Sequence, residues 1–173
     1  MVLIPAVAAD LPAVAELVNG AYRGAGAARG WTHEADFLDG ARTTLEALRQ
    51  DLETQPGALL VFRDGPEAEL AGCVWLQPAT AETWYLGMLS VRPERQAGGL
   101  GRTILEAAEA LARARGGQRM RMTVVNIRDT LIAWYGRRGY AWTGETEAFP
   151  YDDERVGRPK RDDLCFVVLE KPL

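Results

Sequence analysis

Val91-Arg-Pro-Glu-Arg-Gln-Ala-Gly-Gly-Leu-Gly-Arg102 joins the end of a predicted strand to the start of a predicted amphipathic helix. A turn of this kind exposes several backbone N–H groups at a helix N-terminus, where the helix dipole also favours negative charge. The glycines Gly98, Gly99 and Gly101 let a ligand approach the main chain without meeting a side chain. The segment therefore predicts a site for a phosphate or pyrophosphate group.

Three phosphate-binding patterns can be compared with this turn. The dinucleotide pattern G-x-G-x-x-G fails because Ile104 occupies its third glycine position and Asn126 stands where an acidic residue would hold a ribose. A Walker loop fails because the chain has no Gly-Lys-Ser/Thr sequence. The pattern Q-x-x-G-x-G is met by Gln96, Gly99 and Gly101. The structural alternative is a tight glycine turn that only joins a strand to a helix. The elements around the turn are therefore needed to distinguish a phosphate site from a structural turn.

Hydrophobic periodicity predicts those elements. Strands are expected at residues 2–7, 58–63, 69–77, 83–91, 119–125, 140–143 and 164–169. Five helices are expected. Their predicted first or capping residues are Asp10, Thr32, Thr43 in the capping box Thr43-Thr-Leu-Glu46, Gly99 and Asp129, and the helix that begins at Thr32 is expected to end at Leu38. Three strands in a row favour an antiparallel half, and the following strand–helix–strand favours one parallel pair. The sequence predicts an α+β fold, a single domain with a mixed, mostly antiparallel sheet flanked by helices.

Composition narrows the choice of partners. The 173 residues are 47% hydrophobic and 25% charged, as in one ordinary globular domain, and a net charge of −4 leaves no long basic face for nucleic acid. No apolar run approaches the ~20 residues of a membrane span. Cys73 and Cys165 lie in apolar runs and His33 is the only histidine, so neither a disulfide framework nor a metal site is expected. We expect a cytoplasmic protein with no metal, no membrane partner and no nucleic-acid partner.

Four pieces of sequence in a fixed order carry a resemblance to a known family. They are Leu86-Gly-Met-Leu-Ser-Val91 followed by Pro93, Gln96-Ala-Gly-Gly-Leu-Gly-Arg102, Val124-Val-Asn126, and Ala133-Trp-Tyr-Gly-Arg-Arg-Gly-Tyr140. From about Ala58 to its C-terminus, the chain resembles the GNAT superfamily of acyl-CoA-dependent N-acyltransferases. The resemblance implies one N-acyltransferase domain over residues 1–173, with splayed central strands. It also implies direct transfer of an acetyl group from acetyl-CoA to a primary amine of a small molecule or peptide, with no covalent acyl-enzyme, by a monomer or homodimer.

The resemblance assigns residues to the acetyl-CoA co-substrate. Backbone N–H groups of Gln96, Ala97, Gly98, Gly99, Leu100, Gly101 and Arg102 are expected to hold the pyrophosphate, with Arg95 and Arg102 adding positive charge. Leu89, Ser90 and Val91 are expected to pair with the pantetheine arm, in a wedge opened by a bulge near Gly87. Asn126 matches a residue that contacts this arm, and a strand-end turn is its alternative role.

Catalytic roles follow from the same resemblance. Tyr135 matches a tyrosine whose hydroxyl protonates the departing thiolate, and packing against the sheet is its alternative role. Some relatives carry a glutamate base where this chain has Tyr85, so Glu82 at the start of the same strand becomes the candidate base. Further candidates are Glu34, Asp36, Glu145 and Glu147, and a water chain to solvent is an equal alternative. Cys73 is not expected to act as a nucleophile, because no histidine accompanies it.

The acceptor is expected between two loops, residues 23–34 and 149–163. Trp31, Phe149 and Tyr151 can offer an apolar wall, and the acidic run Asp152-Asp-Glu154 can meet a cationic group. Two rival functions stay open at this point. One is a module that binds acyl-CoA without catalysis, and the other is a different glycine-loop nucleotide binder.

Overall fold

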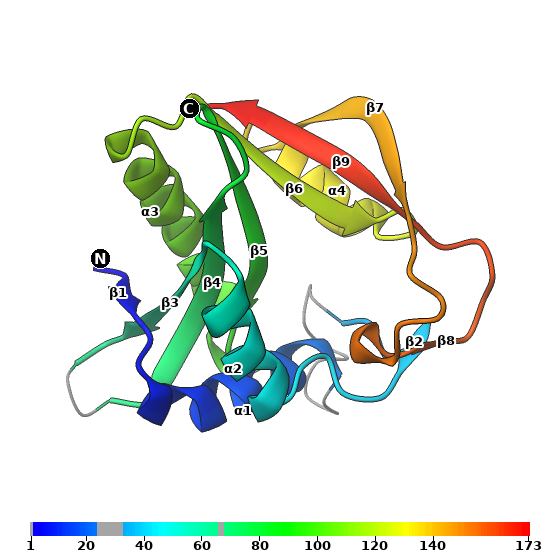
Figure 1. Ribbon diagram of the computed structural model, residues 1–173, viewed down its shortest axis with the longest axis horizontal. Coiled ribbons are helices and arrows are strands. Elements are labelled where there is room, and N and C mark those ends of the chain that lie inside the picture. The colour runs from blue at the N-terminus through cyan, green and yellow to red at the C-terminus, as the bar shows by residue number, and fades with distance from the viewer. Residues whose placement is uncertain (1, 24–32, 66–67) are drawn as a thin grey trace.

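Seven strands form one mixed sheet in the order β1-β3-β4-β5-β6-β9-β7 in the computed structural model, which describes residues 2–23, 33–65 and 68–173 (Figure 1). The strands are β1 (Ile4–Pro5), β3 (Ala58–Arg63), β4 (Leu70–Pro78), β5 (Thr83–Val91), β6 (Arg119–Val125), β7 (Ala141–Ala148) and β9 (Cys165–Pro172). The helices are α1 (Leu11–Tyr22), α2 (Leu45–Thr54), α3 (Leu100–Ala114) and α4 (Asp129–Gly136). Neighbouring strands are antiparallel except β5 and β6, which confirms the predicted α+β fold with a mostly antiparallel sheet.

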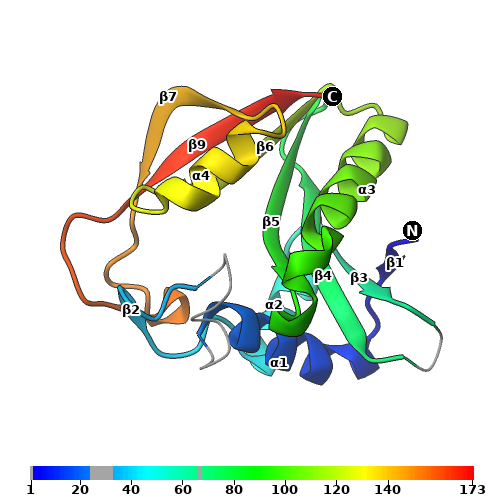
Figure 2. The ribbon, with the colours of Figure 1, turned by 180° about the vertical axis from the view of Figure 1, so that it is seen from behind.

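Different helices cover the two faces of the sheet. One apolar cluster packs α1 and α2 against β3 and β4, with Leu48 and Cys73 among its fully buried residues. A second cluster packs α3 and α4 against the other face and includes Val74 and Ile104, and Figure 2 shows these two helices on the same side of the sheet. Because β4 is buried on both faces, Leu70-Ala-Gly-Cys-Val-Trp-Leu76 forms one apolar run instead of alternating with polar residues.

β5 and β6 are paired at one end only, and their separation opens a wedge in the middle of the sheet. Their parallel pairs are Thr83↔Arg119, Trp84↔Met120 and Tyr85↔Arg121. Beyond these pairs, β5 is bonded to β4 alone among the described strands, and Figures 1 and 2 both show β6 diverging from it. The predicted splay of the central strands is therefore confirmed.

A bulge in β5 lies along the open part of the wedge. β4 has one residue, Val74, where β5 has two, Met88 and Leu89. Met88 has φ = 51°, in the left-handed region that residues with side chains rarely adopt. The bulge predicted near Gly87 is present, and the unusual backbone angle belongs to the residue that follows this glycine.

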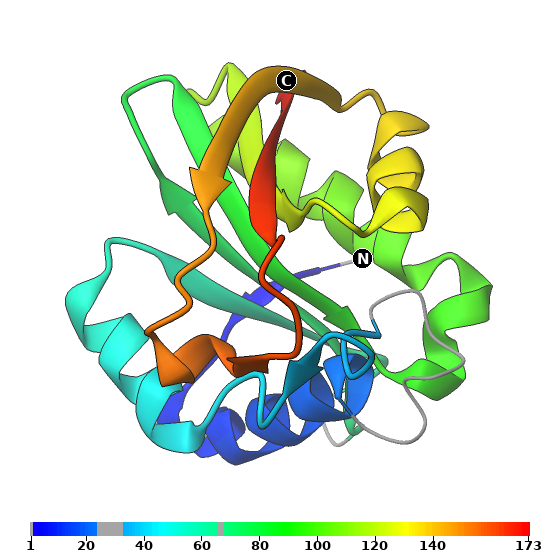
Figure 3. The same cartoon turned by 90° about the vertical axis from the view of Figure 1, so that its right-hand side faces the viewer.

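The short helix predicted up to Leu38 is wrong in its described part, while its expected start, Thr32, lies outside the described residues. Residues 35–37 form a turn, and β2 (Leu38–Asp39) pairs with β8 (Arg158–Pro159) in a separate two-stranded sheet. Figures 1 and 3 show β8, in the segment after β7, lying beside β2. Phe37 and Leu38 are buried there, so a distant strand partner overrides the local helical spacing.

Two predicted helix caps also differ in the structure. The cap of α2 lies one residue later than predicted, because the hydroxyl of Thr44 accepts a hydrogen bond from the N–H of Ala47 at 3.1 Å. Asp10 precedes α1, but its carboxylate accepts from the N–H of Val7 at 2.9 Å and pairs with Arg63 at 2.8 Å. Asp10 therefore ties the start of α1 to β3 instead of capping the helix.

Candidate functional site

The open part of the wedge contains a cavity of about 280 Å³. Its walls come from residues 85–89 of β5, residues 122–125 of β6, α4 and Tyr22 at the end of α1. The lining also includes Phe166 of β9 and four charged side chains, namely Glu34, Arg42, Arg128 and Glu147. Leu89 and Tyr135, which the sequence assigned to the donor arm and to acid catalysis, therefore border one common space.

The backbone of β5 is fixed on the wall of this cavity by two hydroxyl groups. Tyr22 donates a hydrogen bond to the carbonyl of Leu89 at 3.2 Å, and Ser90 donates to the carbonyl of Met88 at 3.0 Å. Burial raises the pKa of Tyr22 to about 12, so its hydroxyl stays protonated at neutral pH. The sequence around Tyr22 shows only the apolar spacing of a helix and carries no signal of this bond.

The glycine turn leads from β5 into α3 as predicted. Pro93–Gly98 forms a 3₁₀ helix, Gly99 adopts φ = 77°, and α3 begins at Leu100. The first N–H groups of an α-helix have no acceptor within the helix. A Cβ atom on Gly98 or Gly99 would meet no other atom within 4 Å, so the main chain is open on this side. The turn thus has the room and the polarity that a pyrophosphate group needs.

The polar side chains of the turn are engaged within the protein. The Nε2 group of Gln96 donates to the carbonyl at the end of β5 at 3.1 Å, which anchors the turn to the strand. Arg95 pairs with Asp64 at 2.5 Å, and Arg102 pairs with Glu106 at 2.7 Å. The positive charge expected from these two arginines is therefore offset locally, and the backbone N–H groups become the main attraction for an anion.

Tyr135 lies on α4 with its ring buried against the sheet and its side chain on the cavity wall. The ring makes edge-to-face contacts with Trp134 and Tyr140. Burial raises the pKa of Tyr135 well above its usual range, Tyr22 adds to the rise, and Arg128 opposes it. Tyr135 is therefore a neutral hydroxyl that combines the packing role with access to the cavity.

Glu82 does not reach this cavity. It precedes β5 at the end where β5 and β6 are still paired, and its carboxylate accepts a hydrogen bond from Gln118 at 3.0 Å. The wedge opens only beyond Tyr85, so the structure places Glu82 away from the cavity that Tyr135 lines. Tyr85 itself lines the cavity and shares a 3.1 Å hydrogen bond with the hydroxyl of Thr123 on β6.

The other candidate carboxylates are divided between the cavity and the surface. Glu34 and Glu147 line the cavity, whereas Asp36 and Glu145 do not. Glu34 is buried and paired with arginines, Asp36 is exposed beside His33, and Glu145 pairs with Arg121 at 2.6 Å. Glu147 lies 3.7 Å from the same arginine and its side chain is 53% exposed.

Asn126 has the contacts of a strand-end residue. Its Nδ2 group donates to the carbonyl of Asp163 at 3.0 Å, and its Oδ1 atom accepts from the N–H of Cys165 at 3.1 Å. These bonds fasten the end of β6 to the start of β9. The structural alternative for Asn126 is therefore supported by its geometry.

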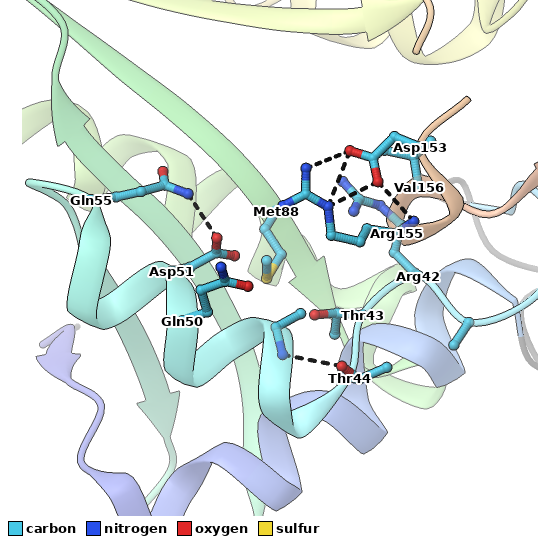
Figure 4. Close-up of a pocket in the computed structure, with 12 residues that line it drawn as sticks. Arg42, Thr43, Thr44, Gln50, Asp51, Gln55, Met88, Asp153, Arg155 and Val156 are labelled. Carbon is cyan, nitrogen blue, oxygen red and sulfur yellow. Dashed lines mark hydrogen bonds and ion pairs between the residues drawn. The ribbon is translucent and has the colours of Figure 1, made fainter. Parts of the chain in front are cut away.

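A second cavity, of about 360 Å³, lies between α2 and residues 153–156 (Figure 4). Figure 4 shows Met88 between α2 on one side and the Asp153–Arg155 ion pair on the other. Arg155 holds the pKa of Asp153 at about 2, so this carboxylate is already satisfied within the protein. Met88 and Arg42 line this cavity as well as the wedge cavity.

The three aromatic residues predicted to form an apolar wall for the acceptor differ in their surroundings. Phe149 is buried and packs edge-on against Tyr151 and stacks on Phe166, so it supports the loop from inside. Tyr151 is partly exposed and accepts a hydrogen bond from the N–H of Leu164 at 2.7 Å. Trp31 lies outside the described residues.

Three further expectations concern thiols, metals and membranes. Cys73 is buried, and burial raises the pKa of its thiol to about 12, which makes it a poor nucleophile. In the described ranges, no three His, Cys, Asp or Glu side chains gather as a group that could hold a metal. Across the same ranges, no helix combines the length and the apolar character needed to cross a membrane.

Solved structures of acetyltransferases share this fold. A ribosomal-protein-alanine N-acetyltransferase from Brucella melitensis has a TM-score of 0.69 at 22% identity, with 100% of each chain covered. A putative phosphinothricin N-acetyltransferase has a TM-score of 0.69 at 17% identity, covering 99% of this chain and 98% of the other. A GNAT acetyltransferase from Elizabethkingia anophelis with acetyl-CoA bound has a TM-score of 0.59 at 17% identity, covering 75% and 84%.

Sequence comparison identifies the family. No curated protein matches the chain. A family model described as "Acetyltransferase (GNAT) family" matches residues 26–140, which is more than half of the chain. This match includes the open glycine turn, both strands of the wedge and Tyr135. The chain therefore belongs to the GNAT family of acetyltransferases.

Proposed function

We propose that the protein transfers an acetyl group from acetyl-CoA directly to the primary amine of a small molecule or peptide. The observation that carries the proposal is the junction of two features, the open glycine turn at the start of α3 and the wedge between β5 and β6. A helix N-terminus suits a pyrophosphate, and an unpaired strand edge suits the amide groups of an extended arm. Family membership and a similar fold that holds acetyl-CoA support this choice of donor.

In this proposal, residues 96–102 hold the pyrophosphate through backbone N–H groups. Leu89, Ser90 and Val91 offer their backbone to the pantetheine arm at the wall of the wedge. Asn126 contributes by fixing the corner between β6 and β9, since both polar atoms of its side chain are already bonded there. The room at Gly98 and Gly99 is the feature of this chain that fits the donor best.

The chemistry requires two proton movements. The amine nitrogen attacks the thioester carbonyl carbon, a C–N bond forms, the C–S bond breaks, and the sulfur leaves with the bonding electrons. Tyr135 enters this step protonated and donates its hydroxyl proton to the departing sulfur. Burial raises the pKa of Tyr135 and keeps the proton on its hydroxyl until the sulfur leaves, and the positive charge of Arg128 offsets part of this rise.

The proton of the attacking amine needs a separate acceptor. Of the two carboxylates that line the wedge cavity, Glu34 has both oxygen atoms paired with guanidinium groups. Glu147 is about half exposed, with 53% of its side chain accessible, so it can accept the proton directly or through water. We therefore assign this role to Glu147 and its water, in place of Glu82.

The proposal covers the whole chain as one N-acyltransferase domain, located in the cytoplasm and active as a monomer or homodimer. Solved structures that share the fold over 99–100% of this chain support its treatment as one folding unit. The composition of the chain supports the location, because both cysteines are unpaired.

Thermal unfolding with three nucleotides tests the donor site. A ligand that binds only the folded state raises the melting temperature, and the rise grows with the ratio of ligand concentration to Kd. At equal concentrations, CoA should raise the melting temperature far more than NAD or ATP. Equal shifts for all three would mean that the start of α3 binds anions without selecting CoA, and the proposed donor would be wrong.

A further inference from the structure

We propose that the amine acceptor also carries a carboxylate, as a free amino acid does, and that Arg42 binds this carboxylate. The inference rests on the proposed acetyl transfer and deepens it by naming the class of acceptor. The inference is drawn from two groups of charged side chains near the wedge cavity: the arginines around Glu34, and the carboxylates around Arg121.

Three guanidinium groups surround one buried carboxylate in the first group. Arg23 lies 3.2 Å from one oxygen of Glu34, and Arg128 lies 3.3 Å from the other. Arg42 lies 4.0 Å from an oxygen that Arg23 already occupies. Arg23 also donates to the main-chain carbonyls of Asp39, Gly40 and Val156. Of the three arginines, Arg42 therefore has the weakest ion pair with Glu34. A partly buried positive charge is costly in free energy unless an anion lies beside it.

Arg42 is held in place while its guanidinium remains turned toward ligand space. Its main-chain N–H donates to Oδ1 of Asn19 at 2.7 Å, and its guanidinium lies 5.4 Å from the centre of the Tyr22 ring. It lines the wedge cavity, the cavity between α2 and residues 153–156, and a third cavity of about 240 Å³ beside Met88. Figure 4 shows Arg42 among the residues that line the second cavity. Arg42 thus lies between the wedge cavity, which we assign to the donor arm, and the two neighbouring cavities, which can accommodate an acceptor.

A guanidinium group suits a carboxylate because its fixed fork can donate two parallel hydrogen bonds. Arg42 has the exposure for this, with 31% of its side chain accessible, whereas Arg23 and Arg128 are almost fully buried. A carboxylate beside Arg42 would supply the counter-charge that Glu34 does not.

A second group of carboxylates, on β7 and β9, reaches the cavity through one member, Glu147. Arg121 on β6 is paired with Glu145, Glu147 and Glu170, so three negative groups share one positive group. Glu147 lines the same cavity as Arg42. An amino acid matches this polarity, with its ammonium group toward Glu147 and its carboxylate toward Arg42. A simple monoamine would leave Arg42 with only Glu34 as its counter-charge, at 4.0 Å and shared with Arg23 and Arg128.

Matched acceptors test the inference. Alanine, glutamate and phenylalanine are compared with their α-carboxamides, which keep the amine and remove the negative charge. For the wild type, kcat/KM in acetyl-CoA-dependent thiol release should favour the acids at least 10-fold over the amides. In Arg42→Gln this preference should vanish through a higher KM for the acids, and Arg42→Lys should restore part of it. An equal or greater rate with the amides would overturn the inference.

Binding provides a second readout that does not depend on turnover. The three amino acids are titrated calorimetrically into protein saturated with CoA. The wild type should bind at least one acid more tightly than its amide, and Arg42→Gln should lose this difference. Arg49→Gln is the matched control, because Arg49 is exposed on α2 and its nearest carboxylate is Glu46 at 3.9 Å. Equal binding of acids and amides would reject the anion site, whereas thiol release with amides alone would leave the acetyl transfer standing.

Discussion

The phenolic hydroxyl of Tyr22, at the end of α1, donates a hydrogen bond of 3.2 Å to the main-chain carbonyl of Leu89 in the bulge of β5. The bond connects the helix that covers one face of the sheet with the strand that forms the wall of the wedge. It fixes the backbone next to Met88, whose positive φ angle is unfavourable without support from its surroundings. Tyr22 therefore positions the strand that we assign to the donor arm.

Replacement of Tyr22 with phenylalanine should loosen this wall while keeping the ring. The variant leaves a buried carbonyl without its donor, which costs about 1–3 kcal/mol in the free energy of unfolding. Because the freed bulge belongs to the proposed arm site, we also expect a several-fold higher Kd for acetyl-CoA. Urea unfolding and calorimetric titration measure the two effects. A destabilised variant with unchanged acetyl-CoA affinity would separate Tyr22 from donor binding.

Tyr135→Phe should reduce turnover more than binding. The substitution keeps the buried ring and its edge contacts but removes the hydroxyl of a side chain that lines the cavity. If the hydroxyl protonates the leaving sulfur, kcat should fall roughly 10²-fold while the Kd of acetyl-CoA changes little. Steady-state thiol release and calorimetry make the comparison. Wild-type kcat in this variant would return Tyr135 to a packing role.

Gly98→Val should weaken CoA binding without weakening the fold. Its Cβ atom would meet nothing within 4 Å in the free protein, so the added bulk only obstructs the pyrophosphate. Gly99→Val is the informative comparison, because Gly99 has φ = 77° and any β-branched residue is strained there. We expect a higher Kd for CoA in both variants and a lower melting temperature only in Gly99→Val. An unchanged Kd in folded Gly98→Val would remove the turn from the donor site.

Asp10→Asn should change the pH dependence of stability. Burial opposes ionisation of Asp10, but the N–H of Val7 and the guanidinium of Arg63 outweigh it and lower its pKa. A lowered pKa stabilises the fold above the unfolded pKa near 3.8, and this contribution is lost as pH falls through the folded value. At pH 7 the variant should be less stable by up to about 1 kcal/mol. The gap to the wild type should close in acid below about pH 4, as followed by thermal unfolding; a gap that is constant down to pH 3 would contradict this.

Much of the fold follows from local sequence. The predicted bounds of β3 (Ala58–Arg63), β5 (Thr83–Val91) and β6 (Arg119–Val125) agree with the structure, because their apolar or alternating patterns end at polar or turn-forming residues. The glycine turn and the start of α3 also agree, since glycine, proline and helix periodicity are local signals.

The predictions differ from the structure where contacts between segments far apart in the sequence determine the local conformation or the position of a side chain. Leu38 looks helical by spacing, yet it joins β2 because Pro159 is available as its strand partner. Glu82 looks close to the wedge by position along β5, but the site where β5 leaves β6 depends on tertiary packing. The group around Glu34 is assembled from separate segments and has no pattern in the sequence. Arg42 could therefore be recognised as a site residue only in three dimensions.

Acceptor-dependent transfer is the most direct measurement of the central claim. Purified protein is incubated with acetyl-CoA and a panel of amines that includes amino acids, their amides, polyamines and short peptides. Free thiol and the N-acetylated product are quantified together, with heat-denatured protein as the control. The account predicts equimolar thiol and N-acetyl product with at least one amine, and loss of both in Tyr135→Phe. Tight CoA binding with no amine-dependent thiol release across the panel would contradict it and identify a binding module in place of an enzyme.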